Sequence, residues 1–258
     1  MSVYVVSDLH GAPDPLAKAV PEGATLVLLG DLVNFIDYTS MTGILTEVFS
    51  LEAVEEVVRL RTAGQVEAAR AVMQARSVGR EEEVRIAIGE RVTAAYESVF
   101  PALPDPTLLI LGNVDNPAVV SSLLERWPAV RDVDGEVVVL DGERFGFVGG
   151  ALPTPLRVAG EVPEEKMRAT IESLGEVDVI CSHIPPDVPE LCYDTRAGKR
   201  ERGSPDLLRY ILDVQPRRAY FGHVHQPLIS SMHLGRTRCF NVGYFRATQR
   251  AFPHRVED

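Results

Sequence analysis

Residues 3–10 read VYVVSDLH, an apolar run that ends in an aspartate and, two positions later, a histidine. A run this rich in Val and Tyr is typical of a buried β-strand. Side chains at positions i and i+2 of an extended chain point to the same side, so Asp8 and His10 can reach a single ion. Taken alone, such a pair most often only solvates the end of a strand.

Four further blocks of polar, metal-binding residue types follow apolar runs in the same way, and three of them begin with glycine. These blocks are Gly30-Asp31, Gly112-Asn113 with Asp115 close behind, Cys181-Ser182-His183, and Gly222-His223-Val224-His225. In α/β proteins the functional groups gather at the carboxyl ends of strands, so we expect the blocks to meet at one site. Glycine lets the backbone turn sharply and approach a ligand closely.

The rest of the pattern predicts a layered α/β protein. The strand-like runs are 3–7, 25–29, 107–111, 137–140, 144–148, 177–182, 217–221 and 236–242. Those around Gly135 and Gly142 form a hairpin-like pair, and the early ones are apolar throughout, as expected of strands buried on both faces. The helical patterns of this body are 121–127, 164–174 and 205–212.

Residues 41–100 differ from the rest. Three stretches with a period near 3.6, at 51–61, 65–78 and 81–100, are separated by Gly64 and Gly79 and contain no His, Asp or Cys. We expect a single domain over 1–258 with a helical insertion at about 41–100, which serves as a cap or as a surface for a second copy of the chain. Residues 252–258 lack periodicity, and we expect this tail to be loosely held.

Composition narrows the function. The net charge is −11, from 37 acidic and 26 basic residues, and a field of this sign repels duplex nucleic acid. No apolar stretch approaches the roughly 20 residues that a membrane helix needs. The N-terminus has no basic region or cleavage site of a signal peptide, so we expect a cytoplasmic protein without a membrane partner.

The cysteines and serines offer no obvious nucleophile. Cys181, Cys192 and Cys239 are odd in number and lack C-x-x-C spacing, which favours reduced thiols, with Cys181 as a small buried hydrophobic residue. No serine lies in a G-x-S-x-G turn and no phosphate-binding G-x-x-x-x-G-K-[ST] loop is present. Serine hydrolase and P-loop functions therefore lack support.

The order of the blocks, D-x-H, G-D, G-N-x-D, H and G-H-x-H, resembles the calcineurin-like metallophosphoesterase superfamily, and the resemblance runs from Asp8 to His225. It implies a four-layer αββα sandwich of two mixed sheets flanked by helices. It also implies two metal ions with Asp31 as the bridge between them. One ion would be held by Asp8, His10, Asp31 and His225, and the other by Asp31, Asn113, His183 and His223.

Carboxylates, imidazoles and one amide suit Mn, Fe or Zn, and these residue types do not choose among the three. Two such ions about 3.5–4 Å apart can share a hydroxide that attacks phosphorus. We assign catalytic roles to Asp31, Asn113 and Asp115, of which Asp115 orients a neighbouring ligand without binding metal itself.

Val114 departs from the family pattern, because many members have a histidine there that can donate a proton. A missing general acid costs about 10²- to 10⁴-fold when the leaving group is poor. We therefore expect a phosphodiesterase with stabilised leaving groups, or a proton donor elsewhere, for which His233 and His254 are unassigned candidates. The alternative is a catalytically weak or inactive scaffold that keeps the fold. The spacing after His183 is similar to that of relatives of the class III cyclic nucleotide phosphodiesterases.

A basic cluster lies between the last two blocks, at Arg196, Lys199, Arg200 and Arg202. It is either a solvated loop or a grip for phosphate. We assign Arg196, Arg200 and Arg202 as substrate-binding residues, and we expect a small phosphorylated or nucleotide-like substrate.

Overall fold

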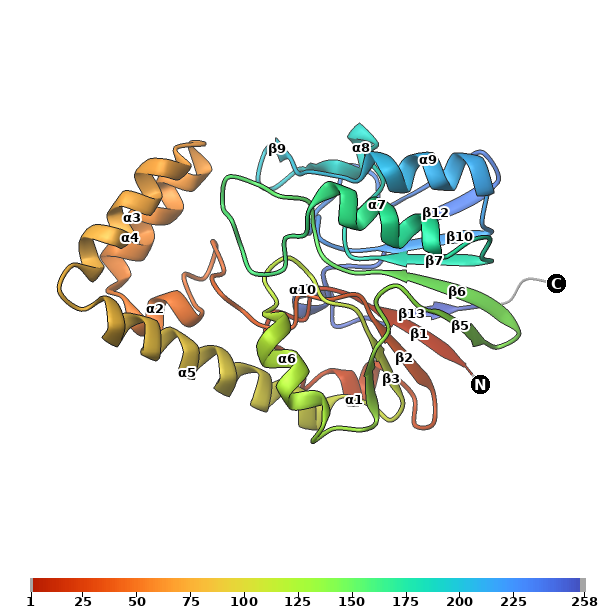
Figure 1. The fold of residues 1–258 in the computed structure, drawn as a ribbon, viewed down its shortest axis with the longest axis horizontal. Helices are drawn as coiled ribbons and strands as arrows, with labels where there is room; N and C mark the ends of the chain where they lie inside the picture. Colours follow the sequence, from red (N-terminus) through yellow and green to blue (C-terminus); the bar gives the residue numbers. More distant parts are fainter. Residues whose placement is uncertain (1, 256–258) are drawn as a thin grey trace.

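The structure, a computed structural model, describes residues 2–255. Two β-sheets face each other, and helices cover the outer face of each sheet (Figure 1). The predicted four-layer αββα architecture is confirmed.

The first sheet has the strand order β13-β1-β2-β3-β4, in which β1 to β4 run parallel and β13 is antiparallel to β1. Its strands are β1 (Val3–Val6), β2 (Thr25–Leu28), β3 (Thr107–Leu109), β4 (Val130–Asp132) and β13 (Phe252–His254). The first three agree with the expected strands to within two residues at either end.

The second sheet has the order β11-β12-β10-β7-β6-β5, with a parallel centre and an antiparallel strand at each edge. Its strands are β5 (Val137–Leu140), β6 (Glu143–Val148), β7 (Val179–Ser182), β10 (Arg218–Phe221), β11 (Ser231–Leu234) and β12 (Thr237–Asn241). Strands β5 and β6 form the predicted hairpin around Gly142. A small hairpin of β8 (Tyr193–Asp194) and β9 (Lys199–Arg200) stands apart from both sheets.

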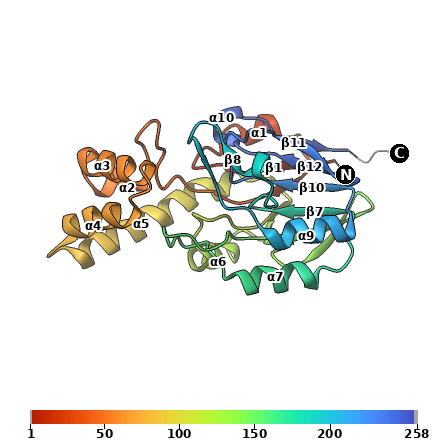
Figure 2. The ribbon, with the colours of Figure 1, turned by 90° about the horizontal axis from the view of Figure 1, so that it is seen from above.

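Helices of the body lie on the outer faces of the two sheets (Figures 1 and 2). They are α1 (Leu16–Ala19), the 3₁₀ helix η1 (Phe100–Ala102), α6 (Pro117–Leu124), α7 (Glu164–Ser173), α8 (Pro189–Cys192), α9 (Pro205–Val214) and α10 (Phe245–Thr248). The expected helix at 121–127 begins four residues earlier, at Pro117, because the Asn116 side chain caps the amides of Ala118 and Val119.

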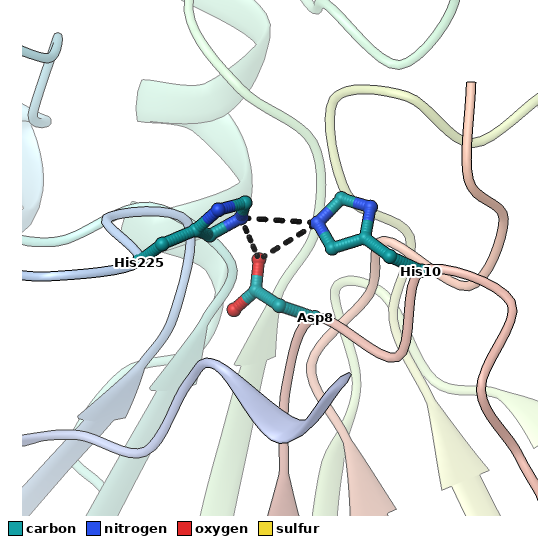
Figure 3. Close-up of side chains that lie close together, drawn as sticks. All are labelled: Asp8, His10 and His225. Carbon is teal, nitrogen blue, oxygen red and sulfur yellow. Dashed lines mark hydrogen bonds and ion pairs between the residues drawn. The ribbon is translucent and has the colours of Figure 1, made fainter. Parts of the chain in front are cut away.

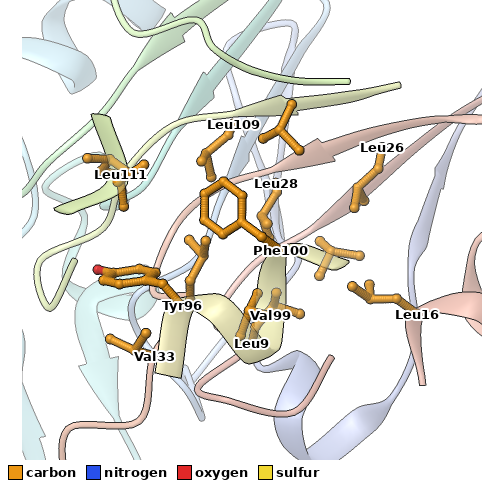
Figure 4. Packing of buried hydrophobic residues seen from close by; sticks show 14 of the residues in the cluster. Leu9, Leu16, Leu26, Leu28, Val33, Tyr96, Val99, Phe100, Leu109 and Leu111 are labelled. Carbon is orange, nitrogen blue, oxygen red and sulfur yellow. The ribbon is translucent and has the colours of Figure 1, made fainter. Parts of the chain in front are cut away.

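Alternate side chains of each central strand enter different parts of the core. Between the sheets, Val5, Val27 and Ile110 pack against Phe147 and Tyr220. The other face of the first sheet packs on its helices, where Leu28 and Leu109 meet Tyr96 and Phe100 (Figure 4). Burial on both faces explains why these strands are apolar throughout.

Residues 44–99 form a helical arm, most of which stands to one side of the sandwich in both views (Figures 1 and 2). It consists of α2 (Ile44–Val48), α3 (Leu51–Thr62), α4 (Val66–Ser77) and α5 (Glu81–Val99). Helices α3 and α4 pack on each other around Val57, Leu60 and Ala69. Helix α5 instead runs back into the core of the body.

The expectation of a loosely held tail is wrong for residues 252–254, which form the edge strand β13. His254 lies opposite Val3 of β1, and its buried ring binds Glu143 at 2.5 Å and the Tyr220 hydroxyl at 3.1 Å. These partners lie far away in the sequence, so no local pattern signals the strand. Residues 256–258 lie outside the described part of the chain.

The three cysteines are buried and unpaired, as expected of reduced thiols. Burial raises the pKa of Cys192 to about 11, which leaves its thiol protonated and unreactive near neutral pH. Among residues 2–255, no helix combines the length and the apolar composition needed to cross a bilayer.

Candidate metal centre

The polar blocks meet at one edge of the sandwich, beyond the carboxyl ends of strands from both sheets. Residues after β1, β2 and β3 approach from the first sheet, and residues after β7 and β10 approach from the second. The structure brings together all of the residues that the sequence suggested as metal ligands: Asp8, His10, Asp31, Asn113, His183, His223 and His225.

One half of the site is a triangle of Asp8, His10 and His225 (Figure 3). The Nε2 atoms of the two histidines are 3.0 Å apart. Asp8 Oδ1 lies 3.8 Å from His10 Nε2 and 3.6 Å from His225 Nε2. These atoms point toward a common centre, as ligands of one cation would.

The other half contains Asn113, His183 and His223. Asn113 Oδ1 lies 3.0 Å from His183 Nε2 and 2.8 Å from His223 Nδ1. Asp31 lies between the halves, with Oδ1 3.6 Å from His183 Nε2 and Oδ2 3.7 Å from His10 Nε2. Asp8 also approaches Asp31 and His183 to within 4.8 Å, so the two halves form one continuous site.

Outer hydrogen bonds orient the rings of two histidines so that their Nε2 atoms face the other ligands. His183 Nδ1 is 2.7 Å from the Leu29 carbonyl and His10 Nδ1 is 3.3 Å from the Val33 carbonyl. A carbonyl only accepts, so each Nδ1 carries a proton, and Nε2 is left as the atom of each ring that can bind a metal. For His183 this Nε2 lies 3.6 Å from Asp31 Oδ1 and 3.0 Å from Asn113 Oδ1, a set of donor atoms that a divalent cation would fit.

The glycines that precede the ligands are required by close approach, as the sequence predicted. A Cβ on Gly112 would lie 2.1 Å from Asp31 Oδ1, and one on Gly222 would lie 1.9 Å from the Ser7 hydroxyl oxygen. The backbone is strained as well, since Asp8, Asp31 and His223 have φ values of 60°, 55° and 67°. Left-handed backbone at residues with a side chain is uncommon and concentrates at functional sites.

Asp115 supports the site through backbone amides. Its Oδ2 accepts from the amides of Asp31 and Gly112, both at 2.8 Å, and its Oδ1 accepts from the Leu32 amide at 3.0 Å. The buried carboxylate thus joins the loop after β2 to the loop after β3. It holds Asp31 and the residue before Asn113 in place through the chain rather than through their side chains.

The pKa values of the clustered side chains are shifted in different directions. Burial, followed by the charges of Asp8 and Asp115, raises the pKa of Asp31 to about 7. Burial would also raise the pKa of Asp8, but its interaction with His225 and the attraction of the neighbouring histidines in their protonated form outweigh it and lower the pKa well below the ordinary value. Burial lowers the pKa of His10 and of His223 to about 3, so both rings are neutral at pH 7 and free to bind metal.

Three residues at the rim of the site were missed by the sequence predictions: Asp37, Tyr244 and Arg246. Tyr244 stacks on His225, and its hydroxyl lies 3.5 Å from Asp37 Oδ2. Arg246 pairs with Asp37 at 3.4 Å and donates to the carbonyl of His10. Tyr244 and Arg246 follow the end of β12, but they are not metal-ligand types, and Asp37 lies well beyond the end of β2.

The arginines of the basic cluster differ in whether their side chains have a partner within the protein. Arg200 pairs with Asp187 at 2.6 Å, and Arg202 binds Glu164 and the Pro153 carbonyl. The exposed Arg196 has no side-chain hydrogen bond among the described residues, but its charge helps to lower the pKa of Asp37 at the rim, after the larger effects of backbone hydrogen bonds and Arg246. Of the three residues assigned to the substrate, Arg196 is thus the one whose guanidinium stays available.

Neither unassigned histidine lies near the site. His254 lies opposite Val3, at the other end of β1 from Asp8. His233 lies opposite Arg238, which in turn lies beside Arg218 at the start of β10. His223 follows the other end of β10, so His233 lies at the end of the sheet away from the site. Val114 itself packs against the core cluster beneath the first sheet, and its amide donates to Asp31 Oδ1 at 3.0 Å.

Comparison with known proteins agrees with this geometry. The model of the calcineurin-like phosphoesterase family matches residues 1–227. A solved crystal structure resembles the chain with a TM-score of 0.57 at 18% sequence identity, covering 95% of this chain and 91% of the other. At that identity the likeness shows the fold alone. No curated protein matches the sequence.

Proposed function

Because the chain belongs to the calcineurin-like phosphoesterase family, we propose that it is a hydrolase of small phosphodiesters that works with two divalent metal ions. The observation that carries the proposal is the position of Asp31, whose two carboxylate oxygens face different halves of the ligand cluster. A carboxylate placed in this way is suited to bridge two cations.

In this proposal Asp8, His10 and His225 hold one ion and Asn113, His183 and His223 hold the other. Two ions bound there would supply a hydroxide for attack on phosphorus and positive charge for the phosphoryl oxygens. Nitrogen and oxygen donors suit Mn, Fe or Zn. The hydrogen bonds from His183 to Leu29 and from His10 to Val33 keep both rings in the tautomer that metal binding requires.

The preference for diesters rests on Val114. Its partly buried side chain packs against the core and carries no proton to give, and His233 and His254 lie at the opposite end of the strands. An alkyl monoester, whose leaving group needs a proton, would lose about 10²- to 10⁴-fold in rate without a general acid. Esters whose leaving group is already stabilised would be hydrolysed at nearly the same rate without a general acid.

The substrate we propose is small and anionic, and Arg196 is its contact outside the metal centre. A guanidinium that keeps its donors free can bind a phosphate or carboxylate oxygen in a charge-assisted hydrogen bond. A nucleotide-like phosphodiester has such a group, whereas the overall charge of −11 disfavours long nucleic acids. The finer relationship to cyclic nucleotide phosphodiesterases is part of this proposal.

An assay of the purified protein loaded with Mn²⁺ tests the proposal. We expect faster hydrolysis of bis(4-nitrophenyl) phosphate than of 4-nitrophenyl phosphate, and loss of both activities in Asp31→Ala and Asn113→Ala. Asp213→Ala, which removes an exposed carboxylate of α9, serves as the control. Full activity after removal of metal, or in Asp31→Ala, would refute the mechanism.

The second candidate function is a scaffold that has given up turnover, and the valine at position 114 favours it. Buried polar groups are costly to keep together, however, and a retired site has no physical reason to retain them. If the protein with Mn, Fe or Zn bound hydrolyses no diester, monoester or cyclic nucleotide, the scaffold function is established instead.

A further inference from the structure

The helical arm reaches the metal centre through its last helix. Helix α5 enters the core cluster beneath the first sheet with Val92, Tyr96 and Val99, all of them buried. Helices α3 and α4 pack mainly on each other and on α2, away from this cluster. One face of α5 thus joins the arm to this core cluster, together with Ile44 of α2.

Tyr96 is the polar member of that face, and its side chain is fully buried. Its hydroxyl donates to Asp115 Oδ1 at 3.1 Å and accepts from the Asn116 amide at 2.7 Å. A buried phenol needs such partners, because an unpaired hydroxyl would pay the cost of desolvation. Both partners belong to the segment that follows Asn113.

Asp115 passes this contact on to the ligands. The oxygen that accepts from Tyr96 also accepts from Leu32, and the other oxygen accepts from Asp31 and Gly112. A tilt of the Asp115 carboxylate would therefore move the backbone of two ligand loops at once. The hydrogen bond from the Tyr96 hydroxyl restrains that tilt.

We propose that Tyr96 is a positioning residue through which the helical arm fixes Asp31 and Asn113, so that the arm is part of the support of the metal centre and not only a cover. The proposal rests on the proposed function, since it needs the site to bind metal. Tyr96 touches neither substrate nor ion and acts through Asp115.

The test compares Tyr96→Phe with Tyr210→Phe by calorimetric titration of the metal-free proteins with Mn²⁺. Tyr210 is the matched control, because it is also a buried tyrosine of a helix whose hydroxyl donates one hydrogen bond, to the Gly175 carbonyl at 2.6 Å. Both substitutions keep the aromatic ring, so the core stays filled. We expect Tyr96→Phe to weaken Mn²⁺ binding about ten-fold, at the lower end of the effect of supporting residues, and Tyr210→Phe to leave it unchanged.

A double-mutant cycle with Asp115→Ala tests the route of the effect. If Tyr96 acts through Asp115, Tyr96→Phe adds almost nothing to the loss of affinity that Asp115→Ala causes. Wild-type affinity in Tyr96→Phe, an equal loss in Tyr210→Phe, or fully additive losses in the cycle would each overturn the inference while leaving the proposed function intact. Failure of the wild-type protein to bind Mn²⁺, Fe²⁺ or Zn²⁺ would overturn both.

Discussion

The ring of Tyr244 lies flat against the ring of His225, with centroids 4.1 Å apart and planes inclined by 4°. The stack fixes the plane of the imidazole whose Nε2 faces Asp8. We expect Tyr244→Ala to free this ring and to weaken Mn²⁺ binding about ten-fold, as loss of a supporting contact does. Tyr244→Phe keeps the stack and should keep the affinity, which calorimetry will show.

The control for this pair is Tyr38→Ala, which removes an exposed tyrosine of the neighbouring loop. An equal loss in Tyr244→Phe and Tyr244→Ala would assign the effect to the hydroxyl near Asp37 instead of the stack.

The buried charge of Asp31 is expected to lower the free energy of unfolding of the metal-free protein. Its folded-state pKa of about 7 lies above its ordinary value of 3.8, so the cost is fully present above about pH 7, shrinks as the pH falls, and is gone below about pH 4. Asp31→Asn keeps an oxygen for the Val114 amide but carries no charge. We expect it to raise the unfolding temperature in a chelating buffer, by about 2–4 °C for each kcal/mol recovered.

The gain should be larger at pH 8 than at pH 5, while phosphodiesterase activity is lost at both. A lower unfolding temperature for Asp31→Asn at pH 8, or the same gain at both pH values, would show that the buried charge is not what limits stability.

Gly222 is expected to be irreplaceable for metal binding. A Cβ there would lie 1.9 Å from the Ser7 hydroxyl oxygen and 2.4 Å from Asp8 Oδ2, so Gly222→Ala must displace Asp8. Gly89→Ala is the control, because a Cβ in that part of α5 meets nothing within 4 Å and alanine favours a helix by up to about 1 kcal/mol. Titration with Mn²⁺ should show loss of binding only in Gly222→Ala; retained binding would mean that the loop adapts.

Arg196 and Arg200 are expected to differ although they lie on one hairpin. Arg196→Ala should raise KM for a nucleotide-like diester about ten-fold, the worth of one charged hydrogen bond, with kcat nearly unchanged. Arg200→Ala removes the partner of Asp187 and should leave KM as it is. Steady-state kinetics on both variants decide the point, and a rise in KM confined to Arg200→Ala would show that the substrate lies elsewhere.

The sequence predicted the strand ends and the polar blocks after them well, because both are local. An apolar run such as 25–29 and the Gly30-Asp31 block that ends it are neighbours in the chain. Because functional groups gather at the carboxyl ends of strands, the blocks could then be predicted to meet at one site. The start of α6 was missed although Asn116 and Pro117 form a local signal for it.

The supporting contacts could not be predicted in this way. Tyr96 and Asp115 are 19 residues apart, and Tyr244 and His225 also 19, and nothing in the spacing indicates that either pair meets. The order of strands in the sheets and the edge position of β13 likewise depend on pairing between distant segments. A buried tyrosine on a helix face that lacks any other polar group is the one signal that could have drawn attention to Tyr96.

Anomalous diffraction from crystals of the protein grown with Mn²⁺ tests the central claim most directly. We predict two manganese peaks on either side of the Asp31 carboxylate, one in contact with Asp8, His10 and His225 and the other in contact with Asn113, His183 and His223. A map with no peak beside Asp31, or with manganese bound only at other places on the molecule, would contradict the account.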